Sequence, residues 1–339
     1  MREYRRPRET LAPMRAITVP TPGGPDALTL SEVDDPTPGP VEVVIDVAAA
    51  GVNRADVAQR EGNYPSPDGA PEWPGLEVSG TVVALGASVT AWKVGDYVVA
   101  LLPGGGYADR VAVDEGLVLP MPRRVDLVEA AGLPEAVATV WSNLFMNAGL
   151  KAGETLLVHG GTSGVGTIAI QLATALGVTV YATAGSPQKV AVTEHLGATR
   201  GINYREEDFV DVIAEATDGR GVDVILDMVG GDYLARDVTA LAPGGRIMVI
   251  AAQGGNDATI NVGRLMQKRG RIWGTTLRAR PLDERREIIA QVREHVWPLV
   301  EAGKVRPLLD TVETLDFAHR AHRRMESGDH VGKILLAVR

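Results

Sequence analysis

Short apolar segments, rich in β-branched residues and bounded by Gly, Pro or Asp, recur in the first third of the chain. They predict β-strands, which cover residues 41–52, 77–86, 95–102 and 107–113. Strands this closely spaced are typical of a barrel or a sandwich. The N-terminal part is therefore expected to be a β domain.

The pattern changes in the middle of the chain, where strand-like segments alternate with helical periodicity. The predicted strands cover residues 154–160, 178–185, 222–230, 245–254 and 270–276. The predicted helices cover residues 164–176, 187–196 and 232–241. This alternation predicts a parallel sheet with helices on both faces.

Charged helical periodicity dominates the C-terminal part. A long helix is predicted over residues 283–303, and Pro298 is expected to bend or split it. A second helix, over residues 316–327, precedes a last strand at 332–338. That second helix places His319, His322 and Glu326 on one face, where a solvated polar surface is favoured over a metal site.

The stretch "HGGTSGVG" (159–166) joins a predicted strand to a predicted helix. Gly161, Ser163 and Gly166 have the spacing of G-x-G-x-x-G, with serine in place of the middle glycine, and Gly164 and Val165 complete the turn. Free backbone N–H groups and the positive end of a helix attract phosphate at such a turn. Because further βα units follow, the turn predicts a dinucleotide site rather than a purely structural loop.

The end of the second strand of this region indicates which dinucleotide binds. An acidic residue there would bind the ribose 2′-hydroxyl of NAD. The sequence instead reads "ATAGSPQK" (182–189), which offers Gly185, Ser186 and Lys189. A hydroxyl and an ammonium suit a 2′-phosphate, so NADPH is the expected cofactor; the alternative for Lys189 is a solvated helix position.

Composition narrows the possible partners and location. The 339 residues carry a net charge of −9 and no cysteine, with 45% hydrophobic positions. This length suggests two domains. The sequence has no stripe of basic residues of the kind that binds nucleic acid, so no nucleic-acid partner is expected. No apolar run approaches the ~20 residues of a membrane span. Without cysteine there are no disulfides or thiolate metal ligands, and a cytoplasmic location with a flexible Arg-rich tail over about residues 1–13 is expected.

Several motifs together resemble the zinc-independent quinone oxidoreductases, the zeta-crystallin-like family of the medium-chain dehydrogenase/reductase superfamily. The similarity is greatest to its tumour-suppressor-inducible members. The matching stretches are residues 51–65, 73–80, 100–113, 159–166, 183–189, 225–231 and 331–336. Zinc alcohol dehydrogenases of the superfamily carry a His ligand in Gly-His-Glu, where this chain has Leu76 in "GLEVSG". No metal is therefore expected.

The resemblance implies an α/β fold, in which a Rossmann-type doubly wound parallel sheet is inserted in a GroES-like β-barrel domain. The barrel domain would comprise residues 1–138 and 278–339, and the Rossmann domain 139–277. Members of the family place the active site in the cleft between these domains. They also pair across an edge strand, here 270–276, so a homodimer is expected.

The resemblance also assigns site residues. Asn53 and Tyr64 would line the substrate side of the nicotinamide and act as catalytic residues. Asn53 could hydrogen-bond an acceptor oxygen, and Tyr64 could donate a proton or wall the site. The remaining cofactor contacts implied are Thr139, Tyr204, Ala251, Gln253, Leu277, Arg278 and His330.

The function implied is an NADPH-dependent quinone oxidoreductase acting on a small-molecule quinone. One alternative is an NADPH-dependent reductase of the C=C bond of alkenals or enones. A second alternative is a non-catalytic NADPH-binding protein.

Overall fold

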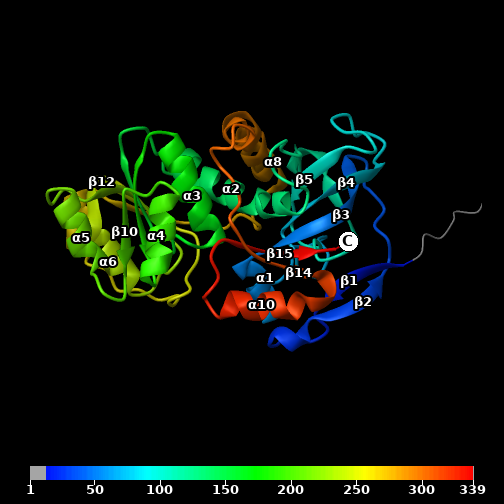
Figure 1. Cartoon of the computed structure of the whole chain (residues 1–339), viewed down its shortest axis with the longest axis horizontal. Coiled ribbons are helices and arrows are strands. Elements are labelled where there is room, and N and C mark those ends of the chain that lie inside the picture. The colour runs from blue at the N-terminus through cyan, green and yellow to red at the C-terminus, as the bar shows by residue number, and fades with distance from the viewer. Residues whose placement is uncertain (1–12, 339) are drawn as a thin grey trace, which may run out of the picture.

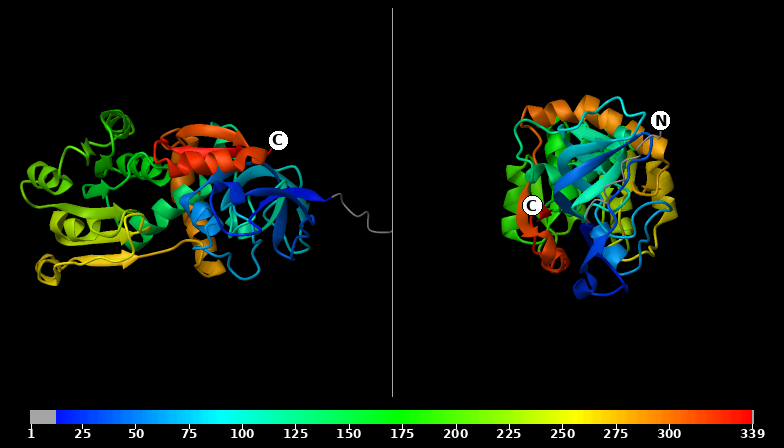
Figure 2. Two further views of the ribbon diagram at one scale, coloured as in Figure 1. Left: turned by 90° about the horizontal axis from the view of Figure 1, so that it is seen from below. Right: turned by 90° about the vertical axis from the view of Figure 1, so that its right-hand side faces the viewer.

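Two lobes lie side by side along the long axis of the molecule, one built on a parallel sheet and one on a β-barrel (Figure 1). The computed structural model describes residues 13–338, so the Arg-rich tail expected at residues 1–13 lies almost wholly outside the described residues. The C-terminal strand returns to the barrel lobe (Figures 1 and 2). This arrangement confirms the predicted fold class.

The sheet of the first lobe has six strands, all parallel, in the order β10-β9-β8-β11-β12-β13. Their bounds are β8 Thr155–Val158, β9 Thr179–Ala184, β10 Arg200–Asn203, β11 Val222–Asp227, β12 Leu241–Val249 and β13 Arg271–Gly274. From β8 the strands are added first on one side (β9, β10) and then on the other (β11, β12, β13), so the strand order reverses between β8 and β11, where such sheets bind ligands. The sequence did not predict β10, because its four residues include Arg200, Gly201 and Asn203, which disfavour a strand.

Helices cover both faces of this sheet, namely α3 (Gly164–Ala175), α4 (Pro187–His195), α5 (Phe209–Ala216), α6 (Tyr233–Ala240) and α7 (Val262–Lys268). Successive residues of β8 point in opposite directions. Leu156 joins the core that contains Ile168 of α3, whereas Leu157 joins the one that contains Phe209 of α5. The two-residue repeat of a strand thus produces two cores, one on each face of the sheet, as expected for a parallel sheet with helices on both faces.

The barrel lobe has a seven-stranded sheet in the order β14-β15-β3-β4-β5-β7, with β6 on β3, and a β1-β2 hairpin beside it. The strands are β1 Met14–Thr18, β2 Thr29–Val33, β3 Glu42–Val52, β4 Glu77–Leu85, β5 Tyr97–Leu101, β6 Arg110–Asp114, β7 Val118–Pro120, β14 Leu309–Thr314 and β15 Lys333–Ala337. Short helical elements are α1 Arg54–Arg60, η1 Pro25–Ala27, η2 Glu115–Leu117, η3 Glu129–Gly132 and η6 Leu315–Phe317. Since β15 pairs with β3, the C-terminal segment completes the barrel.

The long C-terminal helix is divided as Pro298 led us to expect. α8 (Leu282–Gln291) runs into a π-helical turn, η5 (Val292–Val296), and then into α9 (Trp297–Glu301). Pro298 stands in the first turn of α9, where its missing N–H costs no hydrogen bond. α10 (Ala318–Glu326) follows and lies along the barrel lobe (Figure 1).

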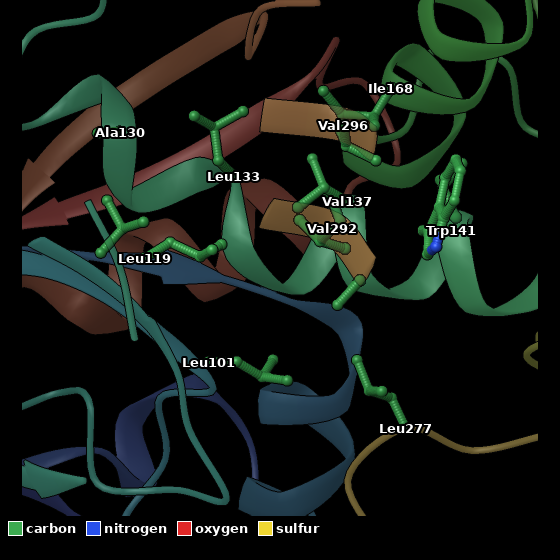
Figure 3. Packing of buried hydrophobic residues seen from close by; sticks show 14 of the residues in the cluster. Leu101, Leu119, Ala130, Leu133, Val137, Trp141, Ile168, Leu277, Val292 and Val296 are labelled. Atoms are coloured by element: carbon green, nitrogen blue, oxygen red, sulfur yellow. The ribbon is translucent and has the colours of Figure 1, made fainter. Parts of the chain in front are cut away.

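A single core connects the two lobes through α2 (Pro134–Val140) and its continuation η4 (Trp141–Asn147). Figure 3 shows the residues of this contact, which are Leu133, Val137, Trp141, Ile168, Val292 and Val296. The domain boundary predicted at residues 138 and 139 falls within α2 and stays a prediction. The same packing fixes α2 firmly between the lobes, which matters for the site below.

Candidate active site

The turn between β8 and α3 requires glycine for two separate reasons. Gly160 has φ +65°, in the left-handed region that favours glycine. A Cβ on Gly166 would collide with the carbonyl oxygen of Gly160. The turn is therefore compact, with its backbone facing the start of α3.

Ser163, which replaces the middle glycine of the motif, is the N-cap of α3. Its Oγ accepts a hydrogen bond from the Gly166 N–H at 2.9 Å. The N–H groups of Gly164 and Val165, in the first turn, have no acceptor within the helix. Together with Gly161 these residues form one turn at the positive end of α3, a geometry that fits a pyrophosphate.

The end of β9 brings Gly185, Ser186, Lys189 and Tyr204 together. A Cβ on Gly185 would meet the Tyr204 hydroxyl, so the ring lies against that backbone. Ser186 caps α4 by accepting from the Lys189 N–H at 3.2 Å. Lys189 donates from Nζ to the carbonyl oxygen of Gly328 at 2.7 Å, and burial lowers its pKa. The grouping predicted for a 2′-phosphate is thus present, with its ammonium bonded to the barrel lobe.

The start of β15 lies directly against the turn. Gly332 donates its N–H to the Thr162 carbonyl at 2.7 Å and forms a parallel bridge with Ser163. His330 lies nearby; its Nδ1 is buried without a hydrogen-bond partner, and burial followed by repulsion from Lys189 lowers its pKa to about 4. His330 is therefore a neutral imidazole at pH 7, with one nitrogen free to bond a ligand.

Ala251 and Gln253 follow the end of β12. The Gln253 N–H donates to the Met228 carbonyl at 3.4 Å, and the Ser163 Oγ reaches the Met228 sulfur at 3.4 Å. The carboxyl ends of β8, β11 and β12 therefore meet, as the predicted cofactor site requires.

Leu277 and Arg278 are both buried, which differs from an open cofactor-contacting surface. Leu277 is 8% exposed and belongs to the core shown in Figure 3. Arg278 donates from Nη2 to Ser66 Oγ at 2.9 Å, and its guanidinium carbon lies 5.2 Å from the centre of the Tyr64 ring. Arg278 thus holds the loop that carries Tyr64; the cofactor contacts of both residues stay predictions.

Asn53 stands immediately before α1, and its polar atoms are held by buried charges. Its Nδ2 donates to Glu77 Oε1 at 3.0 Å, and its Oδ1 accepts from Lys333 Nζ at 2.8 Å. Its backbone N–H donates to Asp56 Oδ2 at 2.8 Å. Asn53 is therefore fixed in one orientation.

Those charges belong to residues of the candidate site that the sequence analysis did not single out. Glu77 and Lys333 are 0% and 2% exposed and form an ion pair. The second oxygen of Glu77 accepts from the Glu135 N–H at 2.9 Å, at the start of α2. Both residues stand inside the matching stretches named above, Glu77 in 73–80 and Lys333 in 331–336. Their pairing could not be predicted from the sequence, because 256 residues separate them.

A second series of buried hydrogen bonds connects Asp56 to Arg60 through Tyr107 and His322. Arg60 can only donate, so His322 accepts at Nδ1 (3.3 Å) and donates from Nε2 to the Tyr107 hydroxyl (3.2 Å). Tyr107 in turn donates to Asp56 Oδ2 at 3.3 Å, and Arg60 pairs with Glu326. The expectation of a solvated face is wrong for His322, which is 0% exposed, because that face of α10 packs on the barrel lobe.

Two further observations concern metals and membranes. Within residues 13–338, no three His, Cys, Asp or Glu side chains are grouped so that they could hold a metal ion. Leu76, at the position of the zinc-ligating histidine, is 1% exposed. Across the same residues, every helix is too short or too polar to cross a bilayer.

Comparisons with known proteins agree with this geometry. Residues 39–123 match the alcohol dehydrogenase GroES-like domain, and residues 164–294 match the family described as zinc-binding dehydrogenase.

Individual relatives match nearly the whole chain. A quinone oxidoreductase of Lama guanicoe is 33% identical over 96% of this chain and 98% of its own length. A mycobacterial protein solved with NADPH has a TM-score of 0.86 and 29% identity, covering 96% of this chain and all of that one. The CurK enoyl reductase has a TM-score of 0.83 and 29% identity, covering 96% of this chain and 99% of that one. The chain belongs to the quinone oxidoreductase family of the medium-chain dehydrogenase/reductase superfamily, whose members are nicotinamide-dependent oxidoreductases.

Proposed function

We propose that the protein is an NADPH-dependent quinone oxidoreductase that works without zinc. The observation that carries the proposal is the β8–α3 turn, which fits a pyrophosphate, with Ser186, Lys189 and Tyr204 grouped beside it. Bound NADPH supplies hydride to the quinone in the interdomain cleft. In this proposal Asn53, which Glu77 and Lys333 hold in one orientation, hydrogen-bonds an acceptor oxygen, and Tyr64 donates a proton or walls the site.

Steady-state reduction of a panel of quinones and a panel of enones, each with NADPH and with NADH, tests this proposal. We expect the highest kcat/KM for a quinone with NADPH. Turnover confined to enones would instead favour the alternative, a C=C reductase, which the likeness to an enoyl reductase supports. Tight NADPH binding without turnover on either panel would favour the non-catalytic alternative.

Zinc independence is tested separately. Leu76 cannot ligate a metal and the chain has no cysteine, so a strong chelator should leave the rate of quinone reduction unchanged. Stoichiometric zinc in the purified protein, lost together with activity, would contradict the proposal.

A further inference from the structure

Helix α2 carries two neighbouring polar side chains that are less buried than the rest of the helix. Leu133, Val137 and Trp141 lie on its apolar side and pack against η5 and α3 (Figure 3). Glu135 and Thr139 are half-buried, whereas the other five residues of α2 are fully buried. At 100° per residue, these two lie one turn apart and about 160° from the apolar side. Glu135 therefore shares the less buried face of α2, on which Thr139 is expected to meet the nicotinamide.

The surroundings of Glu135 are crowded with charge. Its backbone N–H is bonded to Glu77, so its own carboxyl lies close to a second, fully buried carboxylate. The charged and titratable groups that face it come from β4, β15, α1, α8 and the loops after α1 and β13; they are Glu77, Lys333, Asp56, Arg285, Tyr64 and Arg278. Three carboxyl groups thus share the single buried ammonium of Lys333, which already bonds Glu77 and Asn53.

From this placement we infer that Glu135 is the proton donor of the reaction, delivering its carboxyl proton to the substrate anion left by hydride transfer. The inference rests on the proposed function and assigns the proton to a residue other than Tyr64. Tyr64, the other group able to donate on this side, faces the same carboxyl.

The acidity of the two groups separates them. Burial, followed by repulsion from Glu77, raises the pKa of Glu135 to about 8, so its carboxyl is protonated at pH 7. Burial and the nearby Glu135 raise the pKa of Tyr64 above its usual value of 10, which makes it a weaker acid. General acids are most effective when their pKa lies near the working pH.

Hydride from the bound cofactor brings two electrons to the quinone and leaves a phenolate; in an enone it leaves an enolate. The O–H bond of Glu135 breaks, and a new O–H bond (or a C–H bond at the α-carbon) forms on the substrate. Glu135 then regains a proton from water, so one NADPH and one proton are consumed for each acceptor reduced.

Glu135→Gln tests the inference, since it keeps the shape of the side chain and removes its proton. We expect kcat on an enone to fall about 10²-fold, because general acid catalysis contributes at least that much. The affinity for NADPH should stay unchanged. On a quinone the loss should be smaller, since a phenolate can take its proton from water. In the wild type the rate on both substrates should fall as the pH rises through 8, and this step should vanish in the variant.

A readout without turnover completes the test. Infrared titration of the protein without cofactor should show a carboxyl C=O band that disappears with a midpoint near the pKa of about 8, and Glu135→Gln should lack it. Glu129→Gln, a half-buried glutamate in the neighbouring η3, is the matched control and should change neither readout. The inference alone is overturned if Glu135→Gln keeps the wild-type rate and the wild-type pH step. It is also overturned if the infrared titration of the wild type shows no carboxyl titrating between pH 7 and 9. A wild type that reduces neither quinones nor enones overturns the proposed function, and the inference with it.

Discussion

Lys189 makes a hydrogen bond between the two lobes and is also the predicted contact for the 2′-phosphate of the cofactor. Its ammonium bonds the Gly328 carbonyl of the barrel lobe, and its position beside Ser186 and Tyr204 suits a 2′-phosphate. A charge-assisted hydrogen bond contributes about 1.5–3 kcal/mol, which corresponds to about one to two decades in affinity. Lys189→Ala should therefore weaken NADPH about ten- to hundredfold and leave NADH nearly unchanged, as titrations of both cofactors at fixed ionic strength would measure.

Lys93→Ala is the control for that experiment, since Lys93 is 85% exposed and far along the chain from the site. Equal weakening of both cofactors by Lys189→Ala would mean that the bond to Gly328, rather than a phosphate contact, is the role of this lysine. Wild-type protein that binds NADH as well as NADPH would contradict the predicted phosphate site itself.

The Glu77–Lys333 pair is the buried charge on which Asn53 depends. Removing one partner of a buried pair leaves an uncompensated charge and typically costs about 3–5 kcal/mol. Lys333→Met should lower the free energy of unfolding by about that amount, and Glu77→Gln with Lys333→Met should cost less than the two single changes together. Denaturant unfolding of the four proteins measures this coupling. Additive single effects would show that the ion pair contributes nothing, and Lys93→Met should be nearly neutral.

At the scale of elements, the sequence was informative where periodicity is strong and local. The predicted helix at 164–176 starts with α3 and ends within one residue of it, because a glycine turn and a serine cap come directly before an apolar segment. β10 was not predicted, since its four mixed residues carry little periodic signal, and the eight residues of α5 were not predicted either. The environment of His322 was not predictable either: its partners Arg60 and Tyr107 are 262 and 215 residues away along the chain, and the packing of α10 on the barrel lobe buries it.

The burial of His322 has a consequence for stability. Burial and Arg60 lower its pKa to about 3, so the folded protein binds fewer protons than the unfolded chain between pH 3 and 6.5. Stability from this residue is complete above pH 6.5 and is lost as the pH falls, by about 1.4 kcal/mol per pH unit. Burial raises the pKa of Asp56 to about 6, which acts in the opposite sense between pH 4 and 6.

A comparison of variants isolates the histidine. His322→Gln can still accept from Arg60 and donate to Tyr107, but it cannot bind a proton. Its free energy of unfolding should decline less than that of the wild type between pH 6.5 and 4.5. His195→Gln, at an exposed position, should keep the wild-type slope. Identical slopes for all three proteins would show that His322 is not the group responsible.

At the scale of the whole molecule, the candidate site is formed where the lobes meet. The turn before α3 bonds the start of β15, and Lys333 continues from that contact to Glu77 and α2. The motifs in the sequence predicted the glycine turn at 159–166 and singled out the stretch 331–336, but they could not predict that the two are in contact. The reason is that the barrel is completed by β15, which comes from the far end of the chain.

The expected homodimer is a prediction at this same scale. β13 is the last strand of the six-stranded sheet, and one of its edges has no neighbouring strand in the described chain. Unpaired N–H and C=O groups on such an edge favour pairing with a second copy about a two-fold axis. Trp273 on β13 is 50% exposed, and Val262 and Met266 on the preceding α7 are 58% and 71% exposed. Light scattering should therefore give twice the chain mass of 35.9 kDa at micromolar concentration.

Ile272→Pro should break the pairing between the two chains. Because this change can also disturb the hydrogen bonds of β13 to β12, Trp273→Glu serves as a second variant that leaves the backbone intact. Val94→Glu introduces the same charge at an apolar residue of the barrel lobe, 60% exposed, and should leave the dimer unchanged. A monomer mass for the wild type, or dimers that survive both changes at the edge, would show that the chains do not associate through β13.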